Sequence, residues 1–213
     1  MVWSITGGAG FIGSNLARRL VALGKEVRIF DNFATGKREN LDDLYAKVEV
    51  VEGDLRDFAL LIEAMESTEV VFHLAALPSV FRSVRAPTTT NEVNVTGTLN
   101  VLQAARARGV RKVIYSSSSS VYGDSSELPK HEDMAPRPIS PYAVSKLAGE
   151  LYCQSFWKLY GLETVVLRYF NVFGPYQDSS SEYSGVIAKF IDALIRGKSL
   201  TVYGEGDQSR DFT

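Results

Sequence analysis

Short apolar runs alternate with longer segments of helical periodicity along most of the chain. The runs predict strands at Val2–Thr6, Val27–Phe30, Val48–Val51, Val70–His73, Lys112–Ser116 and Thr164–Arg168. Apolar positions at helical spacing predict intervening helices from Ile12 to Leu23, at Phe58–Ala64, at Pro87–Arg108 and at Pro141–Tyr160. Strands that alternate with helices are typical of parallel βα units. The pattern therefore predicts an α/β fold built on a doubly wound parallel sheet.

The pattern changes after Arg168. Residues 171–183 are rich in Gly, Pro, Ser and Asp and lack periodicity, which predicts a long functional loop. A helix at Gly185–Arg196 and a short strand at Leu200–Tyr203 are expected to follow. We therefore predict a first domain at residues 1–170 and the start of a small C-terminal domain at residues 171–213. Because the sequence before Thr213 shows no turn or cap, we expect a truncated chain.

The chain is nearly neutral, with 23 Lys and Arg against 25 Asp and Glu and a formal net charge of -2. No block of like charge and no run of ~18 apolar residues stands out, so we expect no nucleic-acid or membrane partner. One cysteine, Cys153, and two histidines are too few for a zinc or iron-sulfur site, so no metal is expected. The N-terminal sequence resembles no signal peptide, which favours a cytoplasmic protein. The expected partner is a small molecule.

Glycines at Gly7, Gly10 and Gly13 follow the first predicted strand and open the first helix. Glycine lets a backbone turn tightly and approach a pyrophosphate, whose charge then faces the helix N-terminus. Asp31 ends the second strand, where a carboxylate can bind an adenosine ribose and repel a 2'-phosphate. This order of elements predicts a Rossmann-type NAD site, although Lys37 and Arg38 leave NADP open. Asp54 and Leu55, after the third strand, are either adenine contacts or a polar turn.

Tyr142 and Lys146 lie one turn apart at the start of the long helix that follows the fifth strand. A free tyrosine has a pKa of about 10, and a neighbouring ammonium together with a nicotinamide cation favours the phenolate. We therefore expect the pKa of Tyr142 to be lowered, so that it can exchange protons with a substrate. A serine of the run 116–120 is expected to relay the proton or bind the substrate oxygen; the spacing alone leaves open which serine acts.

Taken together, these motifs resemble the extended short-chain dehydrogenase/reductase superfamily, and within it the UDP-hexose 4-epimerases. The likeness rests on the glycine motif with Tyr142 and Lys146, and on three further runs, at residues 73–76, 94–98 and 168–175. It implies a tightly held NAD that takes hydride from C4 of the sugar while tyrosine removes the hydroxyl proton. The keto sugar rotates and hydride returns to its other face, which interconverts UDP-glucose and UDP-galactose.

The resemblance also assigns roles to residues. Tyr142 would be the base, Lys146 would hold the nicotinamide ribose, and Ser118, with help from Ser120, would bind the reacting oxygen. Cofactor contacts are implied for Gly7, Gly10, Phe11, Ile12, Gly13, Asp31, Asn32, Asp54, Leu55, Leu74, Ala75, Ala76, Asn94, Tyr142, Lys146 and Phe170. Substrate contacts are implied for Ser118, Ser120, Tyr142, Asn171, Leu200, Val202, Tyr203 and Arg210. In the family the helices matching Pro87–Arg108 and Pro141–Tyr160 meet across a homodimer interface.

Related activities differ at one position. Sugar-nucleotide dehydratases and decarboxylases carry an acidic residue just before the match to Val121, where this chain has Ser119 and Ser120. The alternatives that stay open are a UDP-N-acetylhexosamine or UDP-glucuronate 4-epimerase, and a non-catalytic NAD-binding module left by truncation. Intact Tyr142, Lys146 and Ser118 favour the enzyme.

Overall fold

The computed structural model describes residues 1–179, 185–202, 204–207 and 209–213. It contains a six-stranded sheet in the order β3-β2-β1-β4-β5-β6. The strands are β1 (Val2–Thr6), β2 (Glu26–Asp31), β3 (Val48–Glu52), β4 (Thr68–His73), β5 (Lys112–Ser118) and β6 (Glu163–Tyr169). Each predicted strand of the sheet is confirmed, and the order reverses between β1 and β4, where doubly wound folds bind ligands.

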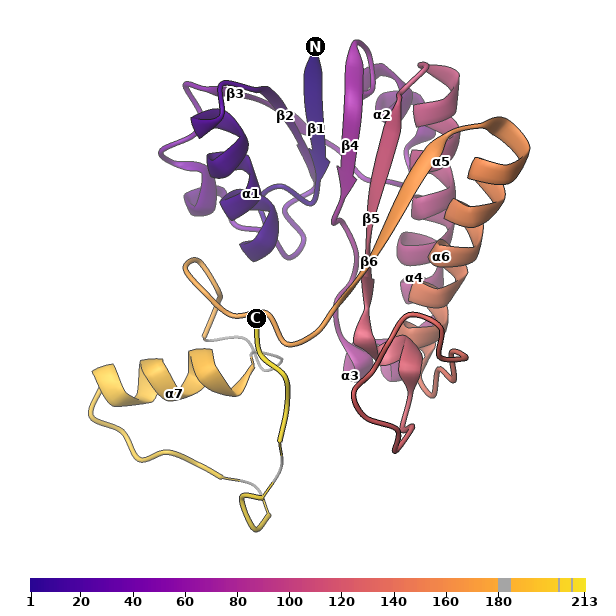
Figure 1. The fold of residues 1–213 in the computed structure, drawn as a ribbon. Coiled ribbons are helices and arrows are strands. Elements are labelled where there is room, and N and C mark those ends of the chain that lie inside the picture. The colour runs from indigo at the N-terminus through magenta and orange to yellow at the C-terminus, as the bar shows by residue number, and fades with distance from the viewer. Residues whose placement is uncertain (180–184, 203, 208) are drawn as a thin grey trace. The chain divides into compact units, whose positions relative to one another are not determined.

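Helices cover both faces of the sheet (Figure 1). On one face, α1 (Phe11–Ala22) packs its buried Ala17 and Leu20 against Ile5 and Ile29. On the other face lie α2 (Phe58–Ala64), α5 (Gly97–Ala107) and α6 (Pro141–Tyr160). Neighbouring strand residues point to opposite faces, as Ile29 and Phe30 do, because side chains alternate along a strand. The doubly wound fold is therefore confirmed.

The segment predicted as one helix from Pro87 to Arg108 is divided. It comprises α4 (Pro87–Asn91), the π-helical turn η2 (Glu92–Thr96) and α5. A further short helix, α3 (Val80–Arg85), precedes it. Hydrophobic periodicity does not reveal a π turn, since a single wide turn adds only one residue to the helix, and such turns are frequent at functional sites. Here the turn carries Asn94.

Helix α6 is capped at both of its ends. Ser140 accepts a hydrogen bond from the backbone N–H of Ala143 at the start of α6, and Pro141 occupies the first turn. Gly161 ends the same helix with a φ of 71°, a conformation that suits glycine. Short 3-10 turns, η1 (Arg38–Leu41) and η3 (Ser119–Tyr122), complete the elements around the carboxyl edge of the sheet.

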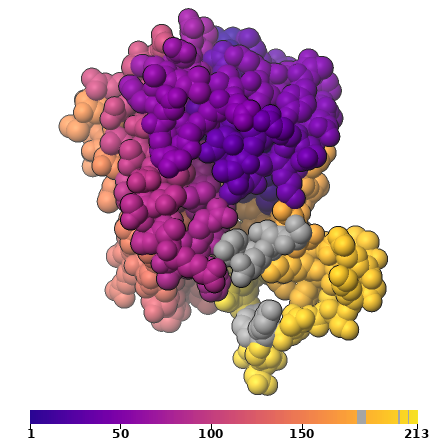
Figure 2. Space-filling model, turned by 180° about the vertical axis from the view of Figure 1, so that it is seen from behind, coloured from indigo at the N-terminus to yellow at the C-terminus, as the bar shows by residue number. Residues whose placement is uncertain are grey.

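The chain forms two compact units, Met1–Arg168 and Tyr169–Thr213. In the space-filling view the first unit, coloured indigo to orange, is a closely packed body (Figure 2). The second unit contains α7 (Val186–Ile195) and a parallel bridge between Asn171 and Phe212. None of the helices in the described ranges is long and apolar enough to span a membrane.

The expected strand at Leu200–Tyr203 is wrong for residues 200–202, which are irregular, and Tyr203 lies outside the described residues. Leu200 and Val202 are exposed. An apolar run forms a strand only where a neighbouring strand accepts its backbone hydrogen bonds, and none pairs with residues 200–202 in the described part of the chain.

Candidate functional site

The glycine loop connects β1 to α1. At two of its three predicted glycines the loop packs so closely against other backbone atoms that a side chain would not fit. Gly7 has a φ of +75°, and a Cβ there would lie 2.6 Å from the backbone nitrogen of Ala75. A Cβ on Gly13 would lie 2.2 Å from the carbonyl oxygen of Gly7. At Gly10 the nearest atom would be 3.3 Å away, again the Gly7 oxygen. Packing therefore excludes a side chain at Gly7 and at Gly13. At Gly10 it disfavours a side chain only slightly.

Helix α1 begins at this loop without a side-chain cap. Its N-cap is Gly10, and no acidic residue lies in its first turn, where Phe11 and Ile12 are half-buried. By contrast, Asp57, Ser79 and Ser140 cap α2, α3 and α6. The first N–H groups of α1 therefore point out of the loop beside a glycine that lets a ligand approach closely. This arrangement fits the pyrophosphate of a dinucleotide.

Asp31, at the end of β2, holds the same loop. Its carboxylate accepts hydrogen bonds from the backbone N–H groups of Ala9 and Phe33, both at 2.9 Å. The carbonyl of Ala9 in turn accepts bonds from the backbone of Lys37 and the side chain of Asn40. Burial raises the pKa of Asp31, and the two N–H groups counteract this. Each carboxylate oxygen retains a lone pair with which to bind a ribose hydroxyl.

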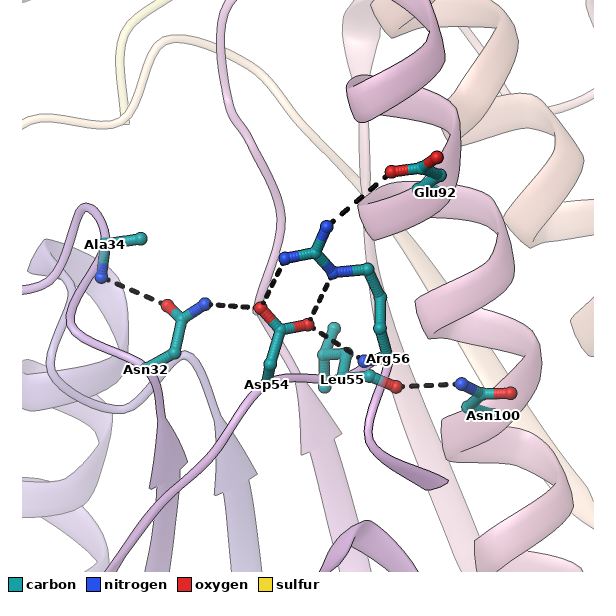
Figure 3. A network of polar contacts seen from close by, with 7 residues as sticks. All are labelled: Asn32, Ala34, Asp54, Leu55, Arg56, Glu92 and Asn100. Atoms are coloured by element: carbon teal, nitrogen blue, oxygen red, sulfur yellow. Dashed lines mark hydrogen bonds and ion pairs between the residues drawn. The ribbon is translucent and has the colours of Figure 1, made fainter. Parts of the chain in front are cut away.

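The predicted adenosine residues Asn32 and Asp54 are joined in a polar network (Figure 3). Arg56 binds both carboxylate oxygens of Asp54 at 2.8 Å, and Asn32 donates to Asp54 at 2.9 Å. The Arg56 guanidinium holds the pKa of Asp54 well below its usual range. Glu92, on η2, lies 3.6 Å from Arg56. Asp54 is therefore a fixed anion, and it also begins a polar turn, because its carboxylate accepts a hydrogen bond of 2.9 Å from the backbone N–H of Arg56.

Leu55, the residue after Asp54, is held by contacts with α5. Its carbonyl oxygen accepts a hydrogen bond of 2.9 Å from the Asn100 side chain on α5, while its own side chain is buried beside Gly97. The network thus connects the segments that follow β2 and β3 to η2 and α5 (Figure 3). The sequence missed Arg56 and Glu92, and the only available signal was their opposite charge.

From the sequence alone, the positive charge of Arg38 leaves NADP possible as the cofactor. In the structure an acidic side chain compensates this charge. The Arg38 guanidinium pairs with Glu52 at 2.6 Å and stacks on the ring of Phe33 at 4.0 Å. A 2'-phosphate would have to compete with Glu52 for this arginine and would face the Asp31 carboxylate. Both features favour a cofactor without that phosphate.

The reactive candidates Ser118, Tyr142 and Lys146 are brought together at the carboxyl end of β5. The hydroxyl of Ser118 lies near the Tyr142 phenol, whose pKa it lowers, and it accepts bonds from the backbone and side chain of Ser120. Lys146 donates to the carbonyl of Ser116 at 2.8 Å, and its Nζ lies 5.9 Å from the centre of the Tyr142 ring. The structure thus distinguishes Ser118 within the serine run.

The expected lowering of the Tyr142 pKa by Lys146 is wrong for the protein's own groups. Burial raises the pKa of Tyr142, and only the Ser118 hydrogen bond lowers it. Burial also lowers the pKa of Lys146 to about 8. The sequence argument counted the charge of Lys146 but not the loss of water around both side chains, which opposes the charged forms. Ser118 and Lys146 are therefore poised to act on a proton at Tyr142.

Asn94 connects this site with the loop after β4. Its amide accepts from the backbone N–H of Leu77 at 2.8 Å and donates to the hydroxyl of Ser145 at 3.0 Å. The backbone N–H of Leu74 donates to the carbonyl of Thr6, which places Leu74 and Ala75 beside Gly7. Ala76 follows next in the chain. The predicted Asn94 and residues 74–76 thus support the loops around the site.

His73 is buried and bonds Thr6 at 2.7 Å and Thr98 at 2.9 Å. Burial and the charge of Lys146 lower its pKa to about 3. It is therefore a neutral side chain that links β1 to α5, and it does not compete with Tyr142 for a proton.

Three of the predicted substrate residues line one cavity in the second unit. Asn171, Val202 and Arg210 surround a space of about 490 Å3 together with residues of α7. Asn171 also donates to the carbonyl of Asp211 at 2.9 Å, which ties the start of this unit to its end. Phe170 precedes Asn171 in this unit, whereas Leu200 is exposed and is not among the lining residues that the structure describes.

Comparison with known proteins gives these features a family context. The model of the NAD dependent epimerase/dehydratase family matches residues 3–213. The chain belongs to this family. A UDP-glucose 4-epimerase of Mycolicibacterium smegmatis is 43% identical over 216 residues, which cover 98% of this chain and 67% of that protein. A UDP-N-acetyl-alpha-D-glucosaminuronate decarboxylase of Bacillus cytotoxicus is 39% identical, over 98% of this chain and 66% of its own length.

Solved structures of this epimerase/dehydratase family superpose closely on the chain. A UDP-N-acetylglucosamine 4-epimerase from Methanobrevibacter ruminantium, in complex with UDP-N-acetylmuramic acid, is 45% identical with a TM-score of 0.94, and the match covers 99% of this chain and 68% of that one. A Thermus thermophilus UDP-glucose 4-epimerase in complex with NAD is 42% identical with a TM-score of 0.90, over 100% and 70% of the two chains. The chain is an NAD-dependent enzyme of this family, and it spans about two thirds of these relatives.

Proposed function

We propose that this protein is a UDP-hexose 4-epimerase that interconverts UDP-glucose and UDP-galactose by transient oxidation at C4 of the sugar. The observation that carries the proposal is that Ser118, Tyr142 and Lys146 meet at the carboxyl end of β5, where the Lys146 Nζ lies 5.9 Å from the centre of the Tyr142 ring and the Ser118 hydroxyl lowers the Tyr142 pKa. A hydroxyl, a phenol and an ammonium in this order can hold a sugar hydroxyl and move its proton.

The chain's own residues would act as follows. Tyr142 takes the proton of the C4 hydroxyl and returns it, while Ser118 and Ser120 bind the reacting oxygen. Lys146, whose pKa burial lowers to about 8, would hold the nicotinamide ribose beside Tyr142, while the Ser118 hydroxyl favours the Tyr142 phenolate. NAD, when bound, would supply the hydride acceptor for C4. Its pyrophosphate would lie at Gly10 and the start of α1, and its adenosine at Asp31, Asn32 and Asp54.

We propose the cavity of the second unit as the site of the UDP group. Asn171 offers an amide donor, Arg210 a cation for the diphosphate, and Val202 an apolar wall, with Leu200 and Tyr203 nearby in sequence. Phe170 would contact the nicotinamide. A guanidinium is suited to phosphate oxygens because it presents several N–H groups in one plane.

A second candidate activity is that of a UDP-N-acetylhexosamine 4-epimerase. It is favoured by the 45% identity to a UDP-N-acetylglucosamine 4-epimerase over 99% of this chain. A decarboxylase or dehydratase is disfavoured, because Ser119 and Ser120 stand where these reactions need an acidic residue. A UDP-glucuronate 4-epimerase is the third candidate. Only analysis of the reaction product distinguishes it from the two epimerase activities above.

We also propose a cytoplasmic homodimer. The outer face of α6 exposes Leu151 and Trp157 by more than half of their surface, and residues of α5 and α6 line a shallow groove beside them. Apolar side chains gathered along a helix pair favour burial against a second copy. A monomeric mass in solution would contradict this part of the proposal.

The test is product analysis by proton NMR. The protein is incubated with UDP-galactose, UDP-N-acetylgalactosamine and UDP-galacturonate separately, beside a Tyr142→Phe variant with the same NAD content. Conversion of UDP-galactose to UDP-glucose that the variant lacks would support the proposal. Conversion of only one of the other sugars would identify that activity instead, and NAD binding without any conversion would support a non-catalytic module.

A further inference from the structure

A buried ion pair lies beneath the reactive residues and has no role in the chemistry described so far. Glu150, on α6, is bound by Arg168 through two hydrogen bonds, Nε to Oε1 at 3.0 Å and Nη2 to Oε2 at 2.7 Å. The side chains are 3% and 16% exposed. Burying two charges costs free energy that their attraction often only offsets, so such a pair is poor evidence for stability alone. Its contacts indicate what else it does.

The second partner of Glu150 is the hydroxyl of Ser117, which donates a hydrogen bond to Oε1. Ser117 lies between Ser116, whose carbonyl accepts a hydrogen bond from Lys146, and Ser118, which lies near Tyr142. Tyr142, Lys146 and Glu150 are spaced four residues apart on one face of α6. Three consecutive serines of β5 thus each face one of these three helix residues, and two of them are hydrogen-bonded to it.

Arg168 extends this contact to the turn that follows Ser118. Its guanidinium lies against the ring of Tyr122 in η3, 4.8 Å from the ring centre. The backbone on both sides of Ser118 is therefore held, by Glu150 through Ser117 before it and by Arg168 through Tyr122 after it. Strand ends without such partners are free to shift along a helix, and a shift of 1 Å in a reacting group costs up to about 100-fold in rate.

We propose that Ser117, Glu150 and Arg168 form a positioning group that fixes Ser118 against Tyr142. None of the three contacts Tyr142, and each acts through the serine strand or η3. The assignment of Ser118 and Tyr142 as reacting residues rests on the proposed function, whereas the positioning itself is a property of the protein without substrate.

The test compares single serines in the same run. Ser117→Ala removes the bond to Glu150 and leaves the ion pair with Arg168, while Ser117→Thr keeps a hydroxyl. Ser119→Ala is the matched control, because the Ser119 hydroxyl makes no hydrogen bond among the residues that the structure describes. Ser118→Ala serves as the reference for complete loss of the bond to Tyr142. Thermal unfolding establishes that every variant is folded.

The readout is ionisation of Tyr142, followed by the ultraviolet absorbance of the phenolate in NAD-loaded protein and isolated by subtracting the Tyr142→Phe variant. Tyr142 faces Ser118 from β5 and Lys146 from its own helix. Glu150 faces Arg168, and its charge raises the pKa of Tyr115 and of Cys153. Apart from the serine that is replaced, all of these groups are present in every serine variant. Ser117→Ala should raise the proton affinity of Tyr142 about tenfold, as Ser118→Ala does, because one hydrogen bond to the phenolate is lost.

Ser117→Thr and Ser119→Ala should titrate as the unmodified protein does. The proposal is overturned if Ser117→Ala titrates like Ser119→Ala, or if Ser117→Thr fails to restore the titration in a folded protein. Absence of epimerase activity in all the proteins would count against the proposed function only, since the ionisation of Tyr142 is measured without a sugar.

Discussion

Lys146 lies with its Nζ 2.8 Å from the carbonyl oxygen of Ser116, buried between α6 and the end of β5. This is the contact that holds the ammonium beside Tyr142. It carries an energetic cost, because burial lowers the pKa of Lys146 from 10.5 to about 8. The site therefore retains a charge that is unfavourable for the fold, which is the pattern expected where a group is needed for chemistry.

Replacing Lys146 with Met should stabilise the protein at pH 7. Below pH 8 the lysine is charged in both folded and unfolded chains, so the folded state bears the full cost, about 3 kcal/mol. Loss of the bond to Ser116 offsets about 1 kcal/mol. Between pH 8 and 10.5 the folded protein releases the proton first, so the stability of the unmodified chain rises and the advantage of the variant shrinks.

Urea denaturation of both proteins, freed of NAD, at pH 7 and pH 10 measures this difference. A Met variant whose advantage is the same at both pH values would show that the ammonium is not the source of the cost. The variant should also lose the proposed epimerase activity, because the positive charge beside Tyr142 is gone.

Gly10→Ala and Gly13→Ala should separate cofactor binding from folding. A Cβ at Gly13 would meet the Gly7 oxygen at 2.2 Å, so Gly13→Ala should destabilise the fold by about 2 kcal/mol or more. At Gly10 the contact would be 3.3 Å, and unfolding should change by less than about 1 kcal/mol. Gly10→Ala should nevertheless weaken NAD binding at least tenfold, because the methyl group occupies the approach of the pyrophosphate.

Thermal unfolding and calorimetric titration with NAD measure the two effects. If Gly10→Ala binds NAD as tightly as the unmodified protein, the pyrophosphate does not lie at the start of α1.

The Arg56 network should contribute to NAD binding rather than to stability. Arg56→Gln releases the Asp54 carboxylate, which the arginine holds through two bonds, and should weaken NAD binding about tenfold by loss of an ordered adenosine contact. Arg111→Gln is the matched control, since Arg111 is similarly exposed and ion-paired to Glu69 and Glu163 away from this site. Titration with NAD should show no change for the control, and equal weakening in both variants would refute a specific role for Arg56.

The sheet and the main helices could be predicted from the sequence because they depend on local patterns. Six apolar runs, the glycine loop and the caps at Ser140 and Gly161 are encoded by neighbouring residues. The π turn at Glu92–Thr96 was missed because it alters hydrogen bonding without altering the apolar pattern. The strand expected at residues 200–202 was wrong because strand formation needs a distant partner.

The residues of the site, too, could be predicted only where they depend on local patterns. Motif spacing predicted Tyr142 and Lys146 as neighbours, the family resemblance added Ser118, and the structure brings the three together. Burial is a property of the whole fold, and it reversed the expected direction of the Tyr142 pKa. Long-range pairs such as Glu150 with Arg168 cannot be predicted from spacing, because they depend on how α6 packs on the sheet.

Transient oxidation at C4 is tested most directly with UDP-galactose that carries deuterium at C4. Hydride transfer to the cofactor and back keeps the label within the protein, so the account predicts UDP-glucose with deuterium retained at C4 and none gained from deuterated water. The Tyr142→Phe variant should form no product. Loss of the label to solvent during epimerisation would show removal of a proton from C4 and would contradict the account.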